Sequence, residues 1–143
     1  MEKKSREQFL DSLANGWQPL VERFQQLSAP EQTAFLEKQG YATFSALLAH
    51  IIAWWQDGVQ VVAQMRADPS LALPDYDVDS FNARAVERFS PLSGAALIQL
   101  YETQRRAMVE LITSLSDAEL DHGPINTRLY YEIIMHWTEH ELS

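Results

Sequence analysis

The chain has 143 residues, 46% of them hydrophobic and 22% charged, with no cysteine and a net charge of −9. This length and composition predict a single globular domain over residues 1–143, and the lack of cysteine excludes disulfides, cysteine-ligated zinc and a cysteine nucleophile. The acidic charge argues against nucleic-acid binding, and no apolar run approaches the roughly 20 residues that a membrane span requires.

The first helical run is predicted near the N-terminus. Apolar residues recur at steps of four and three from Phe9 to Leu27, and Ser5 followed by Gln8 has the pattern of a capping box. Pro19 within this run predicts a kink or a brief break. The preceding residues MEKKSREQF lack the apolar core of a secretory signal, so a cytoplasmic protein is expected.

Helical periodicity continues in three further runs, and no stretch shows strand-like alternation. The runs are predicted at residues 43–67, 93–115 and from 127 to the C-terminus. Residues 28–42 and 116–127 are expected to be tight returns. The connector 68–92 is longer, opens with the turn-rich DPSLALPDYDVD, and contains a short helix around 79–89.

The unequal connectors predict the topology of an all-α four-helix bundle. Short connections alone would produce an up-down-up-down order, whereas a long crossover lets the second and third helices run parallel. The order is then up-down-down-up, and the second and fourth helices are antiparallel.

Histidines mark the candidate site. His136 and His140 are spaced i, i+4, so both lie on one face of the fourth helix and can chelate one ion. His50 lies on the inward stripe of the second helix, and with antiparallel helices the three imidazoles converge. A buried imidazole is costly without a partner, although an isolated inward histidine is more often a hydrogen-bonded core residue than a ligand. His122, in the loop sequence DHGP, is expected to be a surface or capping residue.

These residues carry a resemblance to a known family. The segments LLAHIIAWW (47–55) and MHWTEHEL (135–142) resemble the two histidine motifs of the DinB/YfiT-like superfamily, and the connector 75–94 resembles that of its ClbS/DfsB branch. The resemblance implies a four-helix bundle in which His50, His136 and His140 bind a divalent metal. It implies no single reaction, because function depends on the site and not on the fold.

Besides a non-catalytic bundle whose histidines are relics in a packed core, two functions are compatible with these residues. One is a metal-dependent enzyme that transfers a low-molecular-weight thiol to a small electrophilic substrate, or hydrolyses it. The alternative is a ClbS-like protein that binds small molecules or protects against them without metal catalysis. Three neutral imidazoles suit zinc or nickel, and iron or manganese are also compatible. A small-molecule partner, no membrane contact, and a monomer or homodimer are expected.

Other residues are candidates to line a pocket beside the metal or to hydrogen-bond the histidines that bind it. They are Trp54, Asp57, Asn82, Glu132 and Glu139. Ligating histidines usually donate their second N–H to an oxygen, which Glu132 or Glu139 can supply, although solvated charges on a helix face are the simpler interpretation. Trp54 fits an ordinary core position equally well. Asp79 fits a helix-capping position as well as it fits a position at the pocket mouth.

Overall fold

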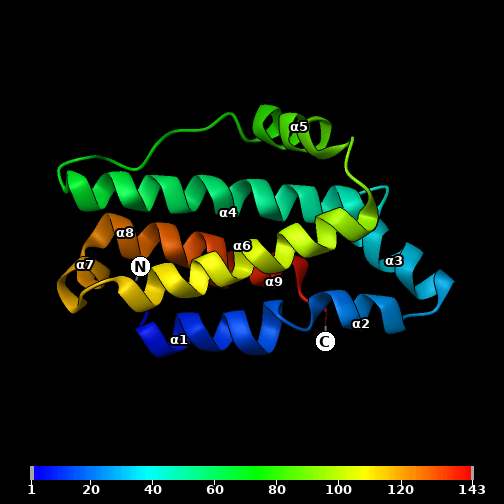
Figure 1. Ribbon diagram of the computed structural model, residues 1–143, viewed down its shortest axis with the longest axis horizontal. Coiled ribbons are helices and arrows are strands. Elements are labelled where there is room, and N and C mark those ends of the chain that lie inside the picture. Colours follow the sequence, from blue (N-terminus) through cyan, green and yellow to red (C-terminus); the bar gives the residue numbers. More distant parts are fainter. Residues whose placement is uncertain (1, 143) are drawn as a thin grey trace.

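Figure 1 shows the computed structural model of the chain, which describes residues 2–142. Regular secondary structure in this range is entirely helical, which confirms the predicted all-α class. The α-helices are α1 (Arg6–Asp11), α2 (Leu20–Gln26), α3 (Ala29–Gln39), α4 (Phe44–Ala67), α5 (Val78–Phe89), α6 (Gly94–Ser114), α7 (Asp117–Asp121), α8 (Gly123–Leu129) and α9 (His136–His140). Two segments are π-helical, η1 (Ser12–Trp17) and η2 (Tyr130–Met135).

The long helices α4 and α6 pack against each other and run in the same direction (Figure 1). The intervening chain returns along the outside of α4 and includes α5, which packs on α4. The C-terminal run α8–η2–α9 lies against α4 and runs the opposite way. The beginning of α4 and the end of the C-terminal run therefore lie at the same end of the molecule. None of the helices described is long and apolar enough to cross a bilayer.

The core consists of aliphatic and aromatic side chains from these helices. The largest fully buried members include Trp17, Trp55 and Tyr101. Trp17 packs edge-on against Trp55, with ring centroids 4.9 Å apart, and its carbonyl accepts a hydrogen bond from the Tyr101 hydroxyl at 2.5 Å. A buried hydroxyl needs a hydrogen-bond partner, and this contact provides one while it links α6 to η1.

The predicted helix at 43–67 corresponds to α4, and its start is set by Thr43. The Thr43 hydroxyl accepts a hydrogen bond from the Ala46 main-chain N–H at 3.1 Å, which satisfies one of the unpaired donors of the first turn.

Replacing Thr43 by alanine is expected to lower the free energy of unfolding by about 1 kcal/mol, because that donor loses its partner. Urea denaturation followed by helical circular dichroism measures the loss. Thr113→Ala, at an exposed position within α6 where the hydroxyl bonds the Val109 carbonyl, is the matched control. An equal effect of the two substitutions would contradict the capping role of Thr43.

The N-terminal run, predicted over Phe9–Leu27 with a kink or brief break at Pro19, is broken at Pro19 as predicted. The Ser5–Gln8 capping box is present, but η1 interrupts the α-helix and Pro19 begins a new one. Residues 28–42 are not the tight return that was predicted, because α3 occupies most of them. Ser28 forms a capping box with Glu31 at its start.

The C-terminal run also differs in its bounds. It begins at Gly123 and not at Thr127, α7 lies within the predicted return, and η2 interrupts the helix before His136. The helix predicted around 79–89 is α5, and Asp77, not Asp79, supplies its capping side chain. Asp79 is exposed.

Candidate metal centre

Three imidazoles meet where α4 and α9 come together. His50 Nε2 lies 3.0 Å from His136 Nε2 and 3.1 Å from His140 Nε2. All three ligand atoms lie within 4.8 Å of one another, and the residues are only 8%, 6% and 6% exposed. The prediction that these three rings converge is confirmed.

The second nitrogen of each ring faces an oxygen. His50 Nδ1 lies 3.0 Å from Asn82 Oδ1, and His140 Nδ1 lies 2.6 Å from Gln39 Oε1. The His136 ring bonds to the main chain of Glu132. Asn82 Oδ1 also accepts the Trp54 indole N–H at 2.7 Å. Since an indole can only donate, this contact identifies the Asn82 oxygen as an acceptor, so His50 Nδ1 must carry the proton.

The ring protonation has a direct consequence for the space between the rings. An imidazole that donates from Nδ1 keeps only a lone pair on Nε2 while it is neutral. The lone pair of His50 Nε2 lies 3.0 and 3.1 Å from those of His136 and His140. These lone pairs cannot hydrogen-bond one another, and a cation between them relieves their repulsion. Two nitrogens each about 2.0–2.1 Å from one tetrahedral zinc ion would be roughly 3.3 Å apart. The donor set and its spacing therefore fit a divalent metal.

The pKa values agree with neutral rings. Burial lowers the pKa of His50 to about 4, partly opposed by its bond to Asn82. Burial, together with the smaller effect of nearby His50, lowers the pKa of His140 to about 3. The pKa of His136 falls well below its ordinary value for the same reasons, burial first. Neutral imidazole is the form that binds a metal, so the fold holds the rings ready for coordination.

The π-helical segments orient His136. They face each other, and two main-chain oxygens of η2 accept hydrogen bonds from side chains. The Ile133 oxygen accepts from the Trp17 indole at 2.9 Å and from the Ser12 hydroxyl at 3.2 Å, and the Glu132 oxygen accepts from the Trp55 indole at 3.1 Å. Single π turns are frequent at functional sites. Here the π turn carries carbonyls that side chains hold in place one turn before the ligand.

A pocket of about 280 Å³ opens beside the rings and is lined in part by His50 and His136. Its other lining residues are Trp54, Val78, Asn82, Tyr131, Glu132, Met135 and Glu139. Val78, Tyr131 and Met135 are three of the larger apolar side chains that the fold leaves exposed. Exposed apolar side chains gathered at one pocket mouth are typical of a small-molecule site.

Behind this pocket lies a buried charged network. Arg128 contacts Glu132 at 3.2 Å, Asp57 at 2.9 Å and the Tyr76 hydroxyl at 2.7 Å, and that hydroxyl also bonds Asp57. Glu132 Oε2 is buried and has no hydrogen-bond partner. Burial raises the pKa of the Glu132 carboxyl, while Arg128 lowers it.

The remaining predicted residues take different places around the centre. Trp54, Asn82, Glu132 and Glu139 line the metal pocket, whereas Asp57 faces a separate cavity and bonds Arg128. Glu132 supports His136 through its main chain, and its carboxylate is turned toward Arg128. His122 lies at the junction of α7 and α8, away from the three rings. Gln39 was not predicted, because the helix that carries it was not.

Replacing Asn82 by alanine is expected to weaken metal binding by roughly 10- to 100-fold, since outer partners of ligating histidines have effects of this size. Competition with a chromophoric chelator measures the affinity. Asn15→Ala, which removes an exposed amide bonded to Asp11, is the matched control. Unchanged affinity in Asn82→Ala would contradict the orienting role of Asn82.

Fold and site together define an all-helical protein with a buried three-histidine centre suited to a divalent metal. The family model of the DinB superfamily matches residues 12–142, and the chain belongs to this superfamily. No curated protein and no solved structure matches the chain significantly.

Proposed function

We propose that this protein is a metal-dependent enzyme that acts on a small electrophilic molecule, either by transferring a low-molecular-weight thiol to it or by hydrolysing it. The observation that carries the proposal is the set of three Nε2 lone pairs directed at one point, beside a pocket of about 280 Å³. We also propose that the chain is an up-down-down-up four-helix bundle of the ClbS/DfsB type, because its connector resembles the connector of that branch.

The donor set supports a catalytic rather than a structural site. Three neutral nitrogen ligands leave a divalent cation its full charge and an open coordination position. A bound zinc or nickel ion would supply Lewis acidity, lowering the pKa of water or of a thiol near neutral pH. Because the chain contains no cysteine, any thiol must come from a cosubstrate.

The chain's own residues have separate tasks in this proposal. Asn82 and Gln39 hold His50 and His140 in the tautomer that exposes Nε2. Val78, Tyr131 and Met135 bind the apolar part of the substrate at the pocket mouth. Glu139, an exposed residue, also lines the pocket and adds a carboxylate to it.

Metal analysis of protein purified without a histidine tag tests the site. We expect about one equivalent of zinc or nickel per chain after incubation with the ion and removal of excess. Clearly substoichiometric metal after this treatment would overturn the metal centre, and the enzyme proposal with it.

An assay of substrate consumption distinguishes an enzyme from the alternative, a ClbS-like binding or protection protein. The metal-loaded protein is incubated with epoxides, alkyl halides and maleyl-type acids, with and without low-molecular-weight thiols, and substrate loss is followed by chromatography. Metal-dependent consumption of one of these classes supports the enzyme. Stoichiometric binding without consumption would favour the alternative.

A further inference from the structure

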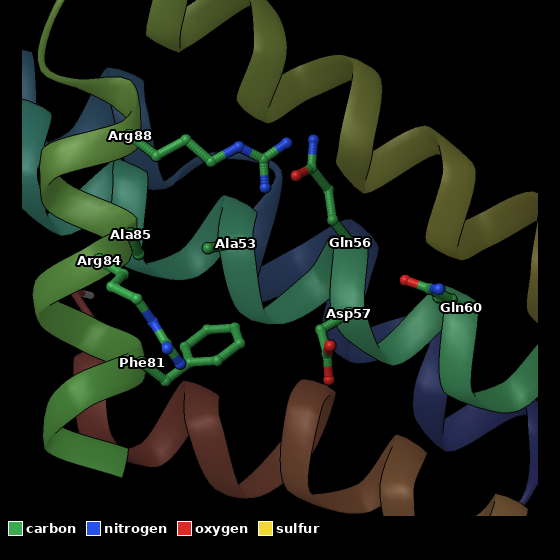
Figure 2. A pocket seen from close by; sticks show the side chains of 8 residues that line it. All are labelled: Ala53, Gln56, Asp57, Gln60, Phe81, Arg84, Ala85 and Arg88. Atoms are coloured by element: carbon green, nitrogen blue, oxygen red, sulfur yellow. The ribbon is translucent and has the colours of Figure 1, made fainter. Parts of the chain in front are cut away.

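A second cavity lies between α4 and α5, and its volume is about 430 Å³. Figure 2 shows that Arg84 and Arg88 from α5 and Gln56 from α4 line it. Its aromatic wall is Phe81, which stacks on Trp54 with ring centroids 3.9 Å apart. Because Trp54 lines the metal pocket, the stacked pair separates the two spaces.

The two arginines of this cavity differ from the others in the chain. Among residues 2–142, Arg84 and Arg88 form neither a hydrogen bond nor an ion pair through their guanidinium groups. Each of the remaining arginines donates to an oxygen of the protein: Arg6, Arg23, Arg66, Arg105, Arg106 and Arg128. With 20 acidic residues in the chain, carboxylates for pairing are plentiful. The two guanidinium groups without a hydrogen-bond or ion-pair partner therefore both belong to residues that line the same cavity; Arg88 also lies over the Phe89 ring, 4.9 Å from its centroid.

The rest of the cavity favours a ligand with both a charged and an apolar part. Arg88 extends from α5 toward the Gln56 side chain, which also lines the cavity (Figure 2). Phe81 and two alanines supply apolar surface. Asp57 also lines the space, but Arg128 at 2.9 Å and the Tyr76 hydroxyl compensate its charge. The uncompensated charge of the cavity is positive.

We propose that this cavity binds a small organic anion whose carboxylate or phosphate group meets Arg84 and Arg88 and whose apolar body lies on Phe81. Guanidinium groups present paired donors that match the geometry of both oxyanions. The i, i+4 spacing places both residues on one face of α5. Because their side chains are exposed, the guanidinium groups can turn toward one ligand. The proposal does not depend on metal binding at the three histidines.

Isothermal titration calorimetry with four probes tests the proposal: acetate, benzoate, inorganic phosphate and phenyl phosphate. We expect saturable one-to-one binding of benzoate or phenyl phosphate, and the stronger of the two identifies the preferred oxyanion. Each aromatic probe should bind more tightly than its counterpart without a ring, because of the Phe81 surface. Absence of saturable binding of both aromatic probes would overturn the proposal, and so would equal binding of an aromatic probe and its counterpart.

Substitutions of the two arginines test whether the probes bind in this cavity. Arg84→Ala and Arg88→Ala should each weaken it by about tenfold, the order expected for one charge-assisted pair at a partly exposed position. Both side chains are exposed, so the fold should tolerate their removal. Arg106→Ala on α6 removes the same charge outside the cavity and should leave binding unchanged. Equal weakening in all three variants would assign the effect to net charge and reject the site. His140→Ala should bind the probe as the wild type does.

Discussion

Replacement of His140 by alanine is expected to lower metal affinity by more than about a hundredfold, while the helical circular dichroism spectrum stays unchanged. The substitution removes one of three ligands, whereas outer partners of such ligands alone account for about 10- to 100-fold. His140 belongs to the five-residue α9 near the C-terminus, so the remaining helices keep their packing. Equilibrium competition with a chelator measures the affinity.

The same variant should lose the stabilisation that metal confers. A ligand that binds only the folded state at a free concentration 100 times its Kd adds about 2.7 kcal/mol to the free energy of unfolding. Zinc should therefore raise the Tm of the wild type and not that of His140→Ala. His122→Ala, a histidine outside the three rings, is the matched control and should keep the full zinc effect. Wild-type metal stoichiometry in His140→Ala would show that the ligands have been misassigned.

The convergence of the histidines could be predicted because it follows from periodicity and connector length. Helical spacing places His136 and His140 on one face, and the inward stripe of α4 contains His50. The outer partner Gln39 could also have been found. Ser28 and Glu31 form a capping-box pattern, and Gly40, with φ of 81°, ends α3 in the left-handed conformation that favours glycine.

The π turns could not be predicted from the same patterns. A π turn shifts the main-chain hydrogen bonds by one residue, and what supports it here is tertiary contact. The Trp17 and Trp55 indoles bond the Ile133 and Glu132 oxygens from segments about eighty or more residues away in the chain. Local sequence contains no signal for such contacts. For this reason Glu132 was interpreted as a solvated charge or as a support for a ligand through its carboxylate. The first interpretation is wrong because Glu132 is buried, and its main chain, not its carboxylate, bonds the His136 ring.

Replacement of Arg128 by methionine is expected to have the largest effect on stability. It leaves the buried carboxyl of Glu132 and the half-buried carboxylate of Asp57 without their cationic partner, while the methionine retains much of the side-chain volume. Removing one member of a buried ion pair typically costs 3–5 kcal/mol, so a loss of about that size is expected at pH 8. Urea denaturation measures it. Arg106→Met, which breaks an exposed pair with Glu102, should cost about 1 kcal/mol or less.

The loss in Arg128→Met should depend on pH with a definite sign. Burial already raises the pKa of the Glu132 carboxyl, and without Arg128 that pKa rises further. A carboxyl with a raised pKa binds its proton more tightly in the folded than in the unfolded state, so its contribution to stability declines as pH rises from the unfolded towards the folded pKa. The difference between variant and wild type should therefore be smaller at pH 5 than at pH 8. A difference that is equal at both pH values would mean that buried charge is not the cause, and that lost packing around the Arg128 side chain is.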